Sequence, residues 1–404
     1  MSNIDKMKEI SHNLAEPEWL LLWRNARALL VETLPKTLKY GIGITGVLPA
    51  HTEESPLALG EDFPLCVDYH VDASKGLELH TWKEAVTQEE VAPILEGLLK
   101  SEFFPKATNY YGGLAQAFFR SGLVVYVQPS VGEGGMLKEE KLVLDTLVPK
   151  GSSADIIVVI AKEGAKLSFV SALSGGDEKS TFSRTVIVLT ERDAEVRITQ
   201  KQTLVNGATL LLSSRGIVAA HSSITWNQIF SGDIAIKSET EDMLIGEFAR
   251  GEIREGIVAN GLAKYDIYSS VRHLADHTHS RIRTTGIGVG TSKIIYRGVV
   301  DMAEGVHTVD GGQEAKFLLL SPNAEIDAIP SLDIASKDVL CTHKLSISHI
   351  RDADTFYPKL RGLSDSESRA LFLECTFAEV FSGEENEEIM REISEYIRKS
   401  NLDT

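Results

Sequence analysis

The alternation of apolar and polar residues changes character at Gly122, where short β-rich runs replace the helical patterns before it. Leu123–Val127 and Ile156–Ile160 are two such runs, and each is bounded by Gly, Asp, Ser or Asn. Short runs of β-branched and aromatic residues between turn-forming residues are typical of strands. The pattern predicts a mainly β domain over residues 121–350.

The β-rich region also carries a spacing that repeats. When its segments are aligned, the central apolar residues lie 29, 28, 29 and 29 positions apart: Leu167, Val196, Ile224, Ile253 and Ile282. A near-constant period of this size indicates a solenoid, in which each coil buries its apolar face against its neighbours. Evenly sized hairpins in an ordinary β-sandwich are the alternative explanation, because the spacing repeats but the residue identities do not.

Helical patterns flank the β region on both sides. A helix is predicted to begin at Trp19, after Glu16-Pro17-Glu18, and Leu20, Trp23 and Leu30 follow its period. We expect a helical N-terminal domain over residues 1–120.

The C-terminal part, residues 351–404, is predicted to hold further helices. Ser364 and Glu367 have the spacing of a capping box at the start of one helix. Ile389, Ile393 and Ile397 form an apolar stripe on a second helix, after Ser382-Gly383.

Charge and composition exclude several classes of protein. The chain has 404 residues, of which 43% are hydrophobic and 25% charged, as in ordinary globular proteins. Its formal net charge of −17 argues against nucleic-acid binding, which requires a basic surface. No apolar run approaches the roughly 18 residues of a membrane span. We expect a cytoplasmic protein that binds neither nucleic acid nor membranes.

Sequence motifs of familiar enzymes are missing or misplaced. The chain contains no GxxxxGK[ST] motif, so we expect no nucleotide hydrolysis by the P-loop route. The glycines of residues 41–46 match GxGxxG but follow a helix, which favours a loop. Ser213–Gly216 and Gly288–Lys293 are interpreted as turns. His277 and His279 are a candidate metal pair without a third ligand nearby in the sequence.

Cys341 and His343 are the strongest candidates for chemistry. They lie two residues apart in a predicted strand, so both side chains would share one face and offer a thiolate beside an imidazole. A buried free cysteine beside a hydrogen-bonded histidine is the structural alternative. The three cysteines, Cys66, Cys341 and Cys375, are far apart, which fits no disulfide framework and no self-contained zinc or iron–sulfur site.

Residues 297–381 also contain a series of short motifs: AKFLLLS at 315–321, IPSLDI at 329–334, DVLCTH at 338–343 and FYPKLRGLS at 356–364. With these motifs the segment resembles the SufB/SufD family of iron–sulfur cluster assembly scaffold subunits. The start Glu16-Pro17-Glu18-Trp19, with Arg24 and Ala28 after it, is similar to the EPxW helix of that family.

The resemblance implies a right-handed parallel β-helix with helical domains at both ends and no catalytic activity of its own. It implies pairing of two subunits through the end of the β-helix, with a nascent iron–sulfur cluster assembled transiently at the interface rather than tightly bound. His343, and after it Cys341, would be the ligands from this chain. The C-terminal helices would dock on SufC, an ABC-type ATPase. The residues expected to contact it are Phe356, Tyr357, Arg361, Gly362 and Phe377.

The chain departs from the family pattern in the loop before the DVLCTH strand and directly after His343, where Lys344-Leu345-Ser346 replaces the Gly-Ala-Thr that the family often has. SufB-type members carry a cysteine before the DVLCTH strand, whereas residues 321–325 here contain none, so the chain is more SufD-like. Three questions stay open: whether it forms a homodimer or pairs with a SufB-like subunit, whether iron or a flavin binds directly, and which residues complete the ligand set. A β-helical enzyme acting on polysaccharides, or a metal-binding protein, is the alternative function.

Overall fold

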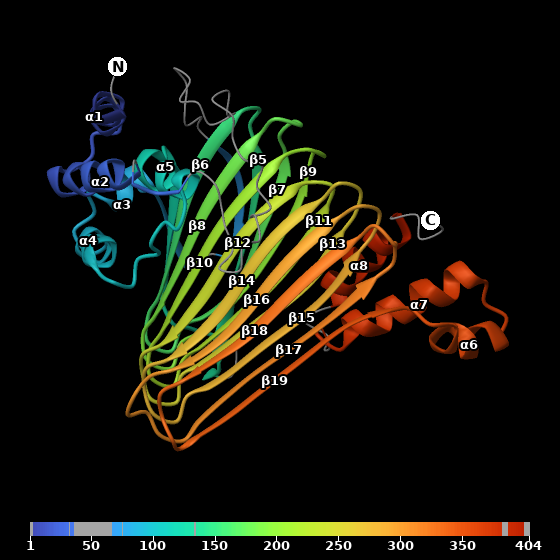
Figure 1. Cartoon of the computed structure of the whole chain (residues 1–404). Helices are drawn as coiled ribbons and strands as arrows, with labels where there is room; N and C mark the ends of the chain where they lie inside the picture. The colour runs from blue at the N-terminus through green and yellow to red at the C-terminus, as the bar shows by residue number, and fades with distance from the viewer. Residues whose placement is uncertain are drawn as a thin grey trace.

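The computed structural model describes residues 3–31, 33–35, 67–74, 76–132, 135–381 and 387–399. A long two-sheet β-solenoid runs through the molecule, with one group of helices at each end of the sequence packed on its flanks (Figure 1). The glycine-rich segment 41–46, Cys66 and Ser382-Gly383 lie outside the described residues.

The N-terminal part consists mostly of helices but also supplies two strands. Its elements are α1 (Asn3–Asn13), α2 (Glu18–Val31), β1 (Asp68–Ala73), β2 (Leu77–Thr81), α3 (Trp82–Ala85), α4 (Ala92–Lys100) and α5 (Tyr110–Phe118). Strand β1 pairs antiparallel with β5, and β2 pairs antiparallel with β3. The segment predicted to be helical thus also supplies the first strand of each sheet.

The solenoid consists of parallel strands that alternate between two sheets. One sheet has the order β1-β5-β7-β9-β11-β13-β15-β17-β19, and the other has the order β18-β16-β14-β12-β10-β8-β6-β3-β2. The strands are β3 (Ser121–Val127), β4 (Ser130–Val131), β5 (Leu137–Val148), β6 (Ser152–Ala161), β7 (Lys166–Gly175), β8 (Thr181–Thr190), β9 (Glu195–Leu204), β10 (Thr209–Val218), β11 (Ser223–Gly232), β12 (Ala235–Leu244), β13 (Arg250–Ala259), β14 (Lys264–His273), β15 (His279–Gly288), β16 (Lys293–Met302), β17 (Val309–Leu319), β18 (Glu325–Ile334) and β19 (Val339–His349). The predicted parallel β-helix with helices at both ends is confirmed.

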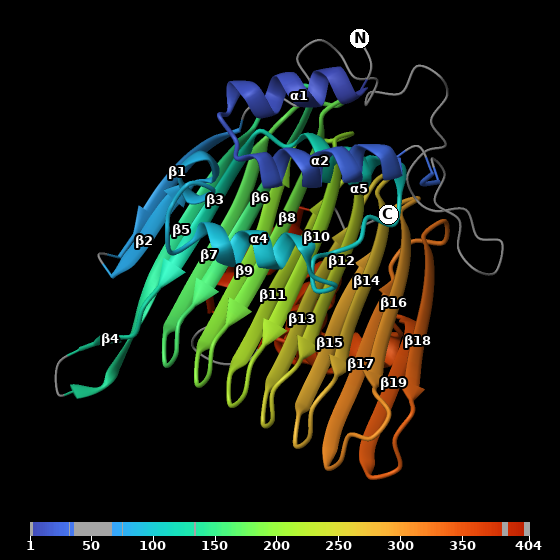
Figure 2. The same cartoon turned by 90° about the vertical axis from the view of Figure 1, so that its left-hand side faces the viewer.

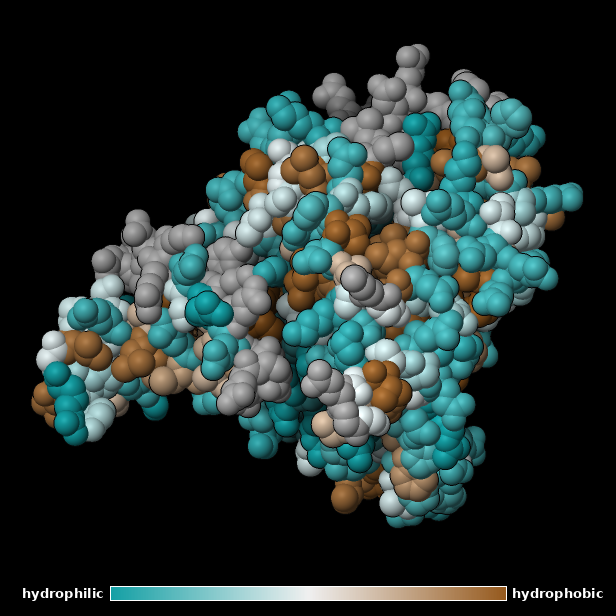
Figure 3. All heavy atoms as spheres, turned by 180° about the vertical axis from the view of Figure 1, so that it is seen from behind, coloured by the Kyte–Doolittle hydropathy of each residue, from teal (hydrophilic) through white to brown (hydrophobic). Residues whose placement is uncertain are grey.

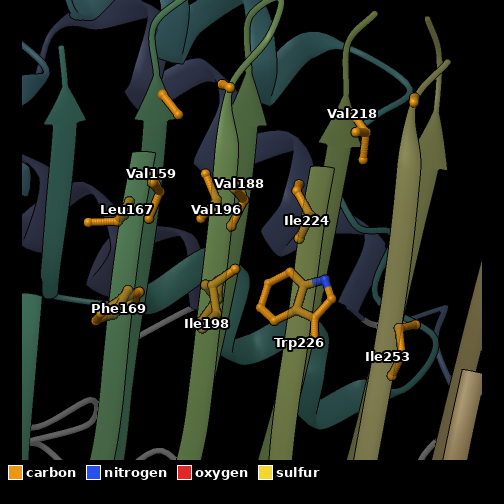
Figure 4. Packing of buried hydrophobic residues seen from close by; sticks show 14 of the residues in the cluster. Val159, Leu167, Phe169, Val188, Val196, Ile198, Val218, Ile224, Trp226 and Ile253 are labelled. Carbon is orange, nitrogen blue, oxygen red and sulfur yellow. The ribbon is translucent and has the colours of Figure 1, made fainter. Parts of the chain in front are cut away.

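The interior is built from columns of side chains that stack from coil to coil. In one column Phe169 lies beside Ile198, then Trp226 and Ile253 (Figure 4). All four are fully buried. Burial of each such side chain stabilises the fold by roughly 1.5–3 kcal/mol, and no coil could bury its own side chains alone.

The repeat was predicted correctly except for one register. Leu167 pairs with Val196, and Val196 with Ile224, as the spacing predicted. Ile224, however, pairs with Gly251 rather than with Ile253. The register is two residues from the predicted one, and a shift of two keeps every side chain on the same face. Apolar periodicity alone is therefore unable to detect it.

Ser213–Gly216, predicted as a turn, lies inside strand β10 instead. Its inward residue Ser214 bonds Gln200, so two serines and a glycine are tolerated within a strand. The predicted turn after Gly288 is present, and Gly290 has φ +73° there.

The N-terminal helices cover the outer face of the sheet that contains β6, β8 and β10 (Figure 2). Arg24 on α2 is completely buried, and its guanidinium bonds the Glu16 carboxylate at 2.6 Å and the carbonyl of Ala117 at 2.8 Å. The Glu-Pro-Glu-Trp start therefore has a structural role, since Glu16 neutralises a charge that burial would otherwise penalise.

The C-terminal helices pack on the opposite sheet. They are α6 (Asp352–Leu360), α7 (Asp365–Ala378) and α8 (Glu387–Lys399). Phe377, Ile389 and Ile393 contact Ile229 and Val258 on the outer face of that sheet. A Cβ at Gly256 would lie 3.0 Å from the ring of Phe381, so glycine permits this close approach. Among the described residues no helix is long and apolar enough to cross a membrane.

Candidate functional site

The last coil leaves one end of the solenoid open. Strands β18 and β19 are the final strands of their two sheets, and each has a strand neighbour on one side only. Positions that face inward in earlier coils are partly exposed here; Leu345 is 38% and Ile347 40% exposed. The end of the solenoid therefore combines two unpaired strand edges with an uncovered apolar interior.

Cys341 and His343 both face inward at this open end. Cys341 pairs with Gly311 and His343 with Gln313, and both partners are buried inward positions of β17. The prediction that the two side chains share one face of a strand is confirmed. His343 ends the interior column of Phe169, Ile198 and Trp226, which is apolar until Gln313.

The two side chains have different surroundings. Cys341 is half-buried and packs against the apolar core, where burial and the nearby Asp310 carboxylate raise the pKa of its thiol. The thiol is thus protonated at neutral pH unless a metal displaces the proton. His343 is exposed and has no hydrogen bond or ion pair with any described residue. Its imidazole is available to an external ligand.

Both ring nitrogens of His273, a nearby histidine, already have hydrogen-bond partners within the chain. Its Nδ1 lies 2.7 Å from Thr278 Oγ1 and its Nε2 lies 2.8 Å from Ser280 Oγ. Burial lowers the pKa of His273 to about 4, so the ring is neutral. Both ring nitrogens are occupied, so His273 is not free to bind a metal ion.

His277 and His279, the candidate metal pair, lie in different backbone settings and contact different residues. His277 has φ +58° in the turn before β15, and its ring stacks on Phe248 with centroids 4.7 Å apart. His279 starts the strand and lies 3.2 Å from the Asp310 carboxylate. In the part of the chain that the structure describes, no three His, Cys, Asp or Glu side chains converge to hold a metal ion. Cys341 and His343 have no third ligand from these residues.

Buried polar groups inside the solenoid are a feature that the sequence analysis missed. Gln228 donates to Gln200 at 2.6 Å, and Thr240 donates to Gln228 at 3.0 Å. Further along, Ser269 and Thr284 donate to the two carboxylate oxygens of Glu255 at 2.5 and 2.6 Å. These residues occupy inward positions of strands, where the alternating pattern predicts apolar side chains. Their regular spacing of one coil could have indicated them.

Glu255 and a second buried carboxylate, Asp242, have strongly shifted pKa values. Burial raises the pKa of Glu255 to about 7, although hydrogen bonds from Ser269 and Thr284 oppose the shift. Burial likewise raises the pKa of Asp242 to about 7, and Trp226 Nε1 donates to this carboxylate at 2.8 Å. The interior therefore favours the protonated form of both groups.

The C-terminal domain carries an exposed apolar surface on α6. Phe356, Tyr357 and Leu360 are 60%, 61% and 67% exposed, and we call them the α6 patch. The lobe that projects at the left in Figure 3 shows apolar side chains on its surface. Large apolar side chains grouped on one helix are unusual at a solvated surface and mark contact sites.

The turn after α6 depends on a glycine with a positive φ. Gly362 has φ +93°, a conformation that glycine adopts without strain. Arg361 bonds the hydroxyl of Tyr357 at 2.7 Å and lies over its ring. The capping box is confirmed, since Ser364 Oγ accepts from the amide of Glu367 and the Glu367 carboxylate accepts from the amide of Ser364.

Phe377 does not fit its predicted role in partner binding. Its side chain is fully buried between α7 and the β-sheet, where it packs with Leu373 and Ile393. The sequence marks Phe377 as an apolar residue of the helix that begins after Ser364, but it does not show that this side chain faces the solenoid of the same chain.

The fold and the open end define a β-solenoid protein flanked by helices, with a thiol and an imidazole at its last coil. The family model described as SUF system FeS cluster assembly, SufBD core domain matches residues 147–375, more than half of the sequence, and the chain belongs to this family.

Curated relatives agree with the family assignment. An iron–sulfur cluster assembly SufBD family protein of Staphylococcus epidermidis is 24% identical over 282 residues, which cover 69% of this chain and 60% of the relative. A family member of Pyropia yezoensis is 23% identical over 292 residues, covering 69% of this chain and 58% of the relative. The aligned part of this chain thus spans about three fifths of the length of these relatives.

Proposed function

We propose that the chain is a non-catalytic scaffold subunit of SUF-type iron–sulfur cluster assembly, and that the open end of its solenoid is where a cluster forms. The family assignment supports a role in cluster assembly. The single observation that carries the proposal is the placement of Cys341 and His343 together on the inner face of β19. The division into residues 1–120, 121–350 and 351–404 remains part of this proposal.

The physical state of the open end supports the proposal that the chain pairs with a second subunit. The exposed edges of β18 and β19 present backbone groups that can extend a sheet, and such edges are usually protected from association. Ile347, Leu345 and Ile334 are inward-facing apolar side chains that remain at least 38% exposed. A second copy of the chain, or a SufB-like subunit, would cover them and complete the strand pairing.

The number of ligands that an iron–sulfur cluster needs also supports a second subunit. An iron–sulfur cluster usually takes about four thiolate or imidazole ligands. This chain brings Cys341 and His343 to the open end, so the remaining ligands would come from the partner. The cluster is cargo of the assembly. Because burial raises the pKa of the Cys341 thiol, binding of iron would release its proton.

ATP hydrolysis would take place in another subunit. The chain has no P-loop motif, and the α6 patch offers an apolar surface beside the Gly362 turn. We propose that an ABC-type ATPase of the SufC type docks there. Phe356 and Tyr357 would supply the apolar contact, while Arg361 holds Tyr357 in place.

Co-expression with the cognate ABC-type ATPase and a SufB-like subunit tests the proposal. We expect a stable complex whose reconstitution with iron and sulfide gives the visible absorption of an iron–sulfur cluster. A chain that purifies without the ATPase, although its C-terminal helices are intact, would contradict the docking role. A complex that forms but never assembles a cluster would contradict the scaffold role.

A further inference from the structure

A polar pocket of about 380 Å³ lies on the flank of the solenoid, far along the sequence from the open end. It lies where the chain after α4, residues 102–108, crosses the outer face of the sheet of β10, β12, β14 and β16 (Figure 2). Ser213 and Arg215 line it from β10. The segment Ser213–Gly216, which suggested only a turn in the sequence, therefore contributes to a cavity of ligand size.

Two of the three carboxylates that line the pocket, Glu239 and Glu241, are already paired. Glu241 Oε2 lies 2.5 Å from a terminal nitrogen of Arg215. Glu239 accepts from Thr108 Oγ1 at 2.7 Å and from Lys237 Nζ at 3.0 Å. These two acidic groups are thus satisfied within the chain and do not form a cation site.

Several basic side chains of the pocket, in contrast, have nitrogen atoms that donate no hydrogen bond to the described residues. Arg272 donates from Nε to Asp301 at 2.7 Å, while its two terminal nitrogens have no partner among the described residues. Lys106 makes no ion pair with any residue that the structure describes. Arg215 Nε is buried and has no hydrogen-bond partner, which costs free energy unless a ligand accepts from it.

The remaining walls and the charge balance limit the kind of anion. Tyr268 adds a half-buried aromatic ring to the lining, while Phe104, Pro105 and Met243 beside it are buried. Arg272 is balanced by Asp301, and the carboxylates of Glu241 and the exposed Glu102 also act on its guanidinium, so the pocket offers hydrogen-bond donors without a large net positive charge. Such a site suits a single carboxylate held by a guanidinium better than a polyphosphate.

We propose that this pocket binds a small monocarboxylate with an apolar body, whose carboxylate accepts from Arg272 and Lys106 and whose body packs on the ring of Tyr268. The proposal concerns the flank of the solenoid and does not depend on cluster assembly at the open end.

Calorimetric titration of the full chain with benzoate tests the proposal, with pyrophosphate and benzamidine as counter-probes. We expect saturable binding of benzoate and weaker or absent binding of both counter-probes. Arg272→Gln and Lys106→Gln should each weaken benzoate binding by about tenfold or more, since each removes a charge-assisted hydrogen bond. Arg197→Gln is the matched control, because Arg197 is similarly exposed, 37% against 41%, on the opposite sheet.

The use of two variants keeps the test decisive if one of them folds poorly, and circular dichroism reports folding for each. Absence of saturable benzoate binding would overturn the proposal. It would equally be overturned if pyrophosphate or benzamidine bound more tightly, or if Arg197→Gln weakened binding as much as Arg272→Gln and Lys106→Gln do.

Discussion

His343 occupies the last position of an interior column, where a side chain has neighbours on one side only. Phe169, Ile198 and Trp226 hold the same inward position deeper in the solenoid and are fully buried. His343 faces the same way but is exposed, because no further coil follows it. An imidazole at this position contributes little to packing and is free for ligand binding.

His343→Ala should therefore reduce cluster assembly without unfolding the chain. We expect its melting temperature to stay within about 1 °C of the wild type, since a side chain without partners contributes little to stability. The absorption of the reconstituted complex should fall severalfold. His12→Ala, an exposed histidine on α1, serves as the control. Unchanged assembly in His343→Ala would return this residue to a structural role.

Glu255 is fully buried, and burial disfavours the ionised form of its carboxylate. Burial raises the pKa of Glu255 to about 7 in the folded chain, whereas in the unfolded chain it lies near 4.5. The folded state therefore holds the proton more tightly. The stability contribution of Glu255 is fully present below pH 4.5 and is lost as the pH rises to about 7.

Glu255→Gln removes this titration and keeps a side chain that can bond Ser269 and Thr284. We expect the variant to gain stability relative to the wild type between pH 5 and pH 8, by on the order of 1–3 kcal/mol. Urea unfolding at the two pH values measures the gain. Glu163→Gln, at an exposed carboxylate, should show no such difference. An equal effect of Glu255→Gln at both pH values would disprove the linkage.

At the scale of elements, α6 differs from the other C-terminal helices in what its apolar residues touch. The stripes of α7 and α8 are buried against the solenoid through Phe377, Ile389 and Ile393. The α6 patch remains exposed. Apolar residues thus pack inside the molecule in α7 and α8, whereas in α6 they form an exposed surface.

Leu360→Asp should abolish ATPase docking and leave the chain folded, because Leu360 is 67% exposed and its loss creates no cavity. Leu262→Asp is the matched control, since Leu262 is 72% exposed in a solenoid turn. Pull-down with the ATPase compares the two. Retention of the ATPase by Leu360→Asp would place the docking surface elsewhere.

Arg361→Ala separates two roles of the turn after α6. Its contact with Tyr357 is solvent-exposed, so we expect a stability loss of less than about 1 kcal/mol. ATPase affinity should fall only as far as Tyr357 loses its position. A drop in melting temperature with unchanged affinity would show that Arg361 acts only within the chain.

At the scale of the whole molecule, the two ends of the solenoid are built from different kinds of strand. Strands β1 and β2 add antiparallel edges at the N-terminal end. At the other end β18 and β19 have no strand beyond them in the described chain. We propose that a second subunit is recruited to the end formed by β18 and β19, because that end carries Cys341 and His343.

Ile347→Asp should prevent this pairing, since a carboxylate at an inward apolar position would be buried without a partner on association. The molar mass by light scattering should fall from that of a pair to that of a single chain, or the SufB-like subunit should no longer co-elute. Leu340→Asp, on the outward face of the same strand and 71% exposed, should leave pairing intact. Loss of pairing in both variants would indicate general damage to β19.

The sequence by itself determined the class of fold and the composition of the candidate site. The period of 28–29 residues, the alternation along strands and the capping box at Ser364 are local features, and local patterns determine which face of an element is apolar. The same reasoning placed Cys341 and His343 on one face. All of these features could be read without knowledge of long-range contacts.

The tertiary structure alone decided what each face meets. The register of Ile224 with Gly251, the burial of Phe377 and the exposure of His343 depend on which segments become neighbours. Buried polar residues such as Glu255 and the strand position of Arg215 were missed because their partners Thr284 and Glu241 lie one coil away. Sequence periodicity specifies the direction of a side chain, whereas burial and charge pairing are properties of contacts between distant parts of the chain.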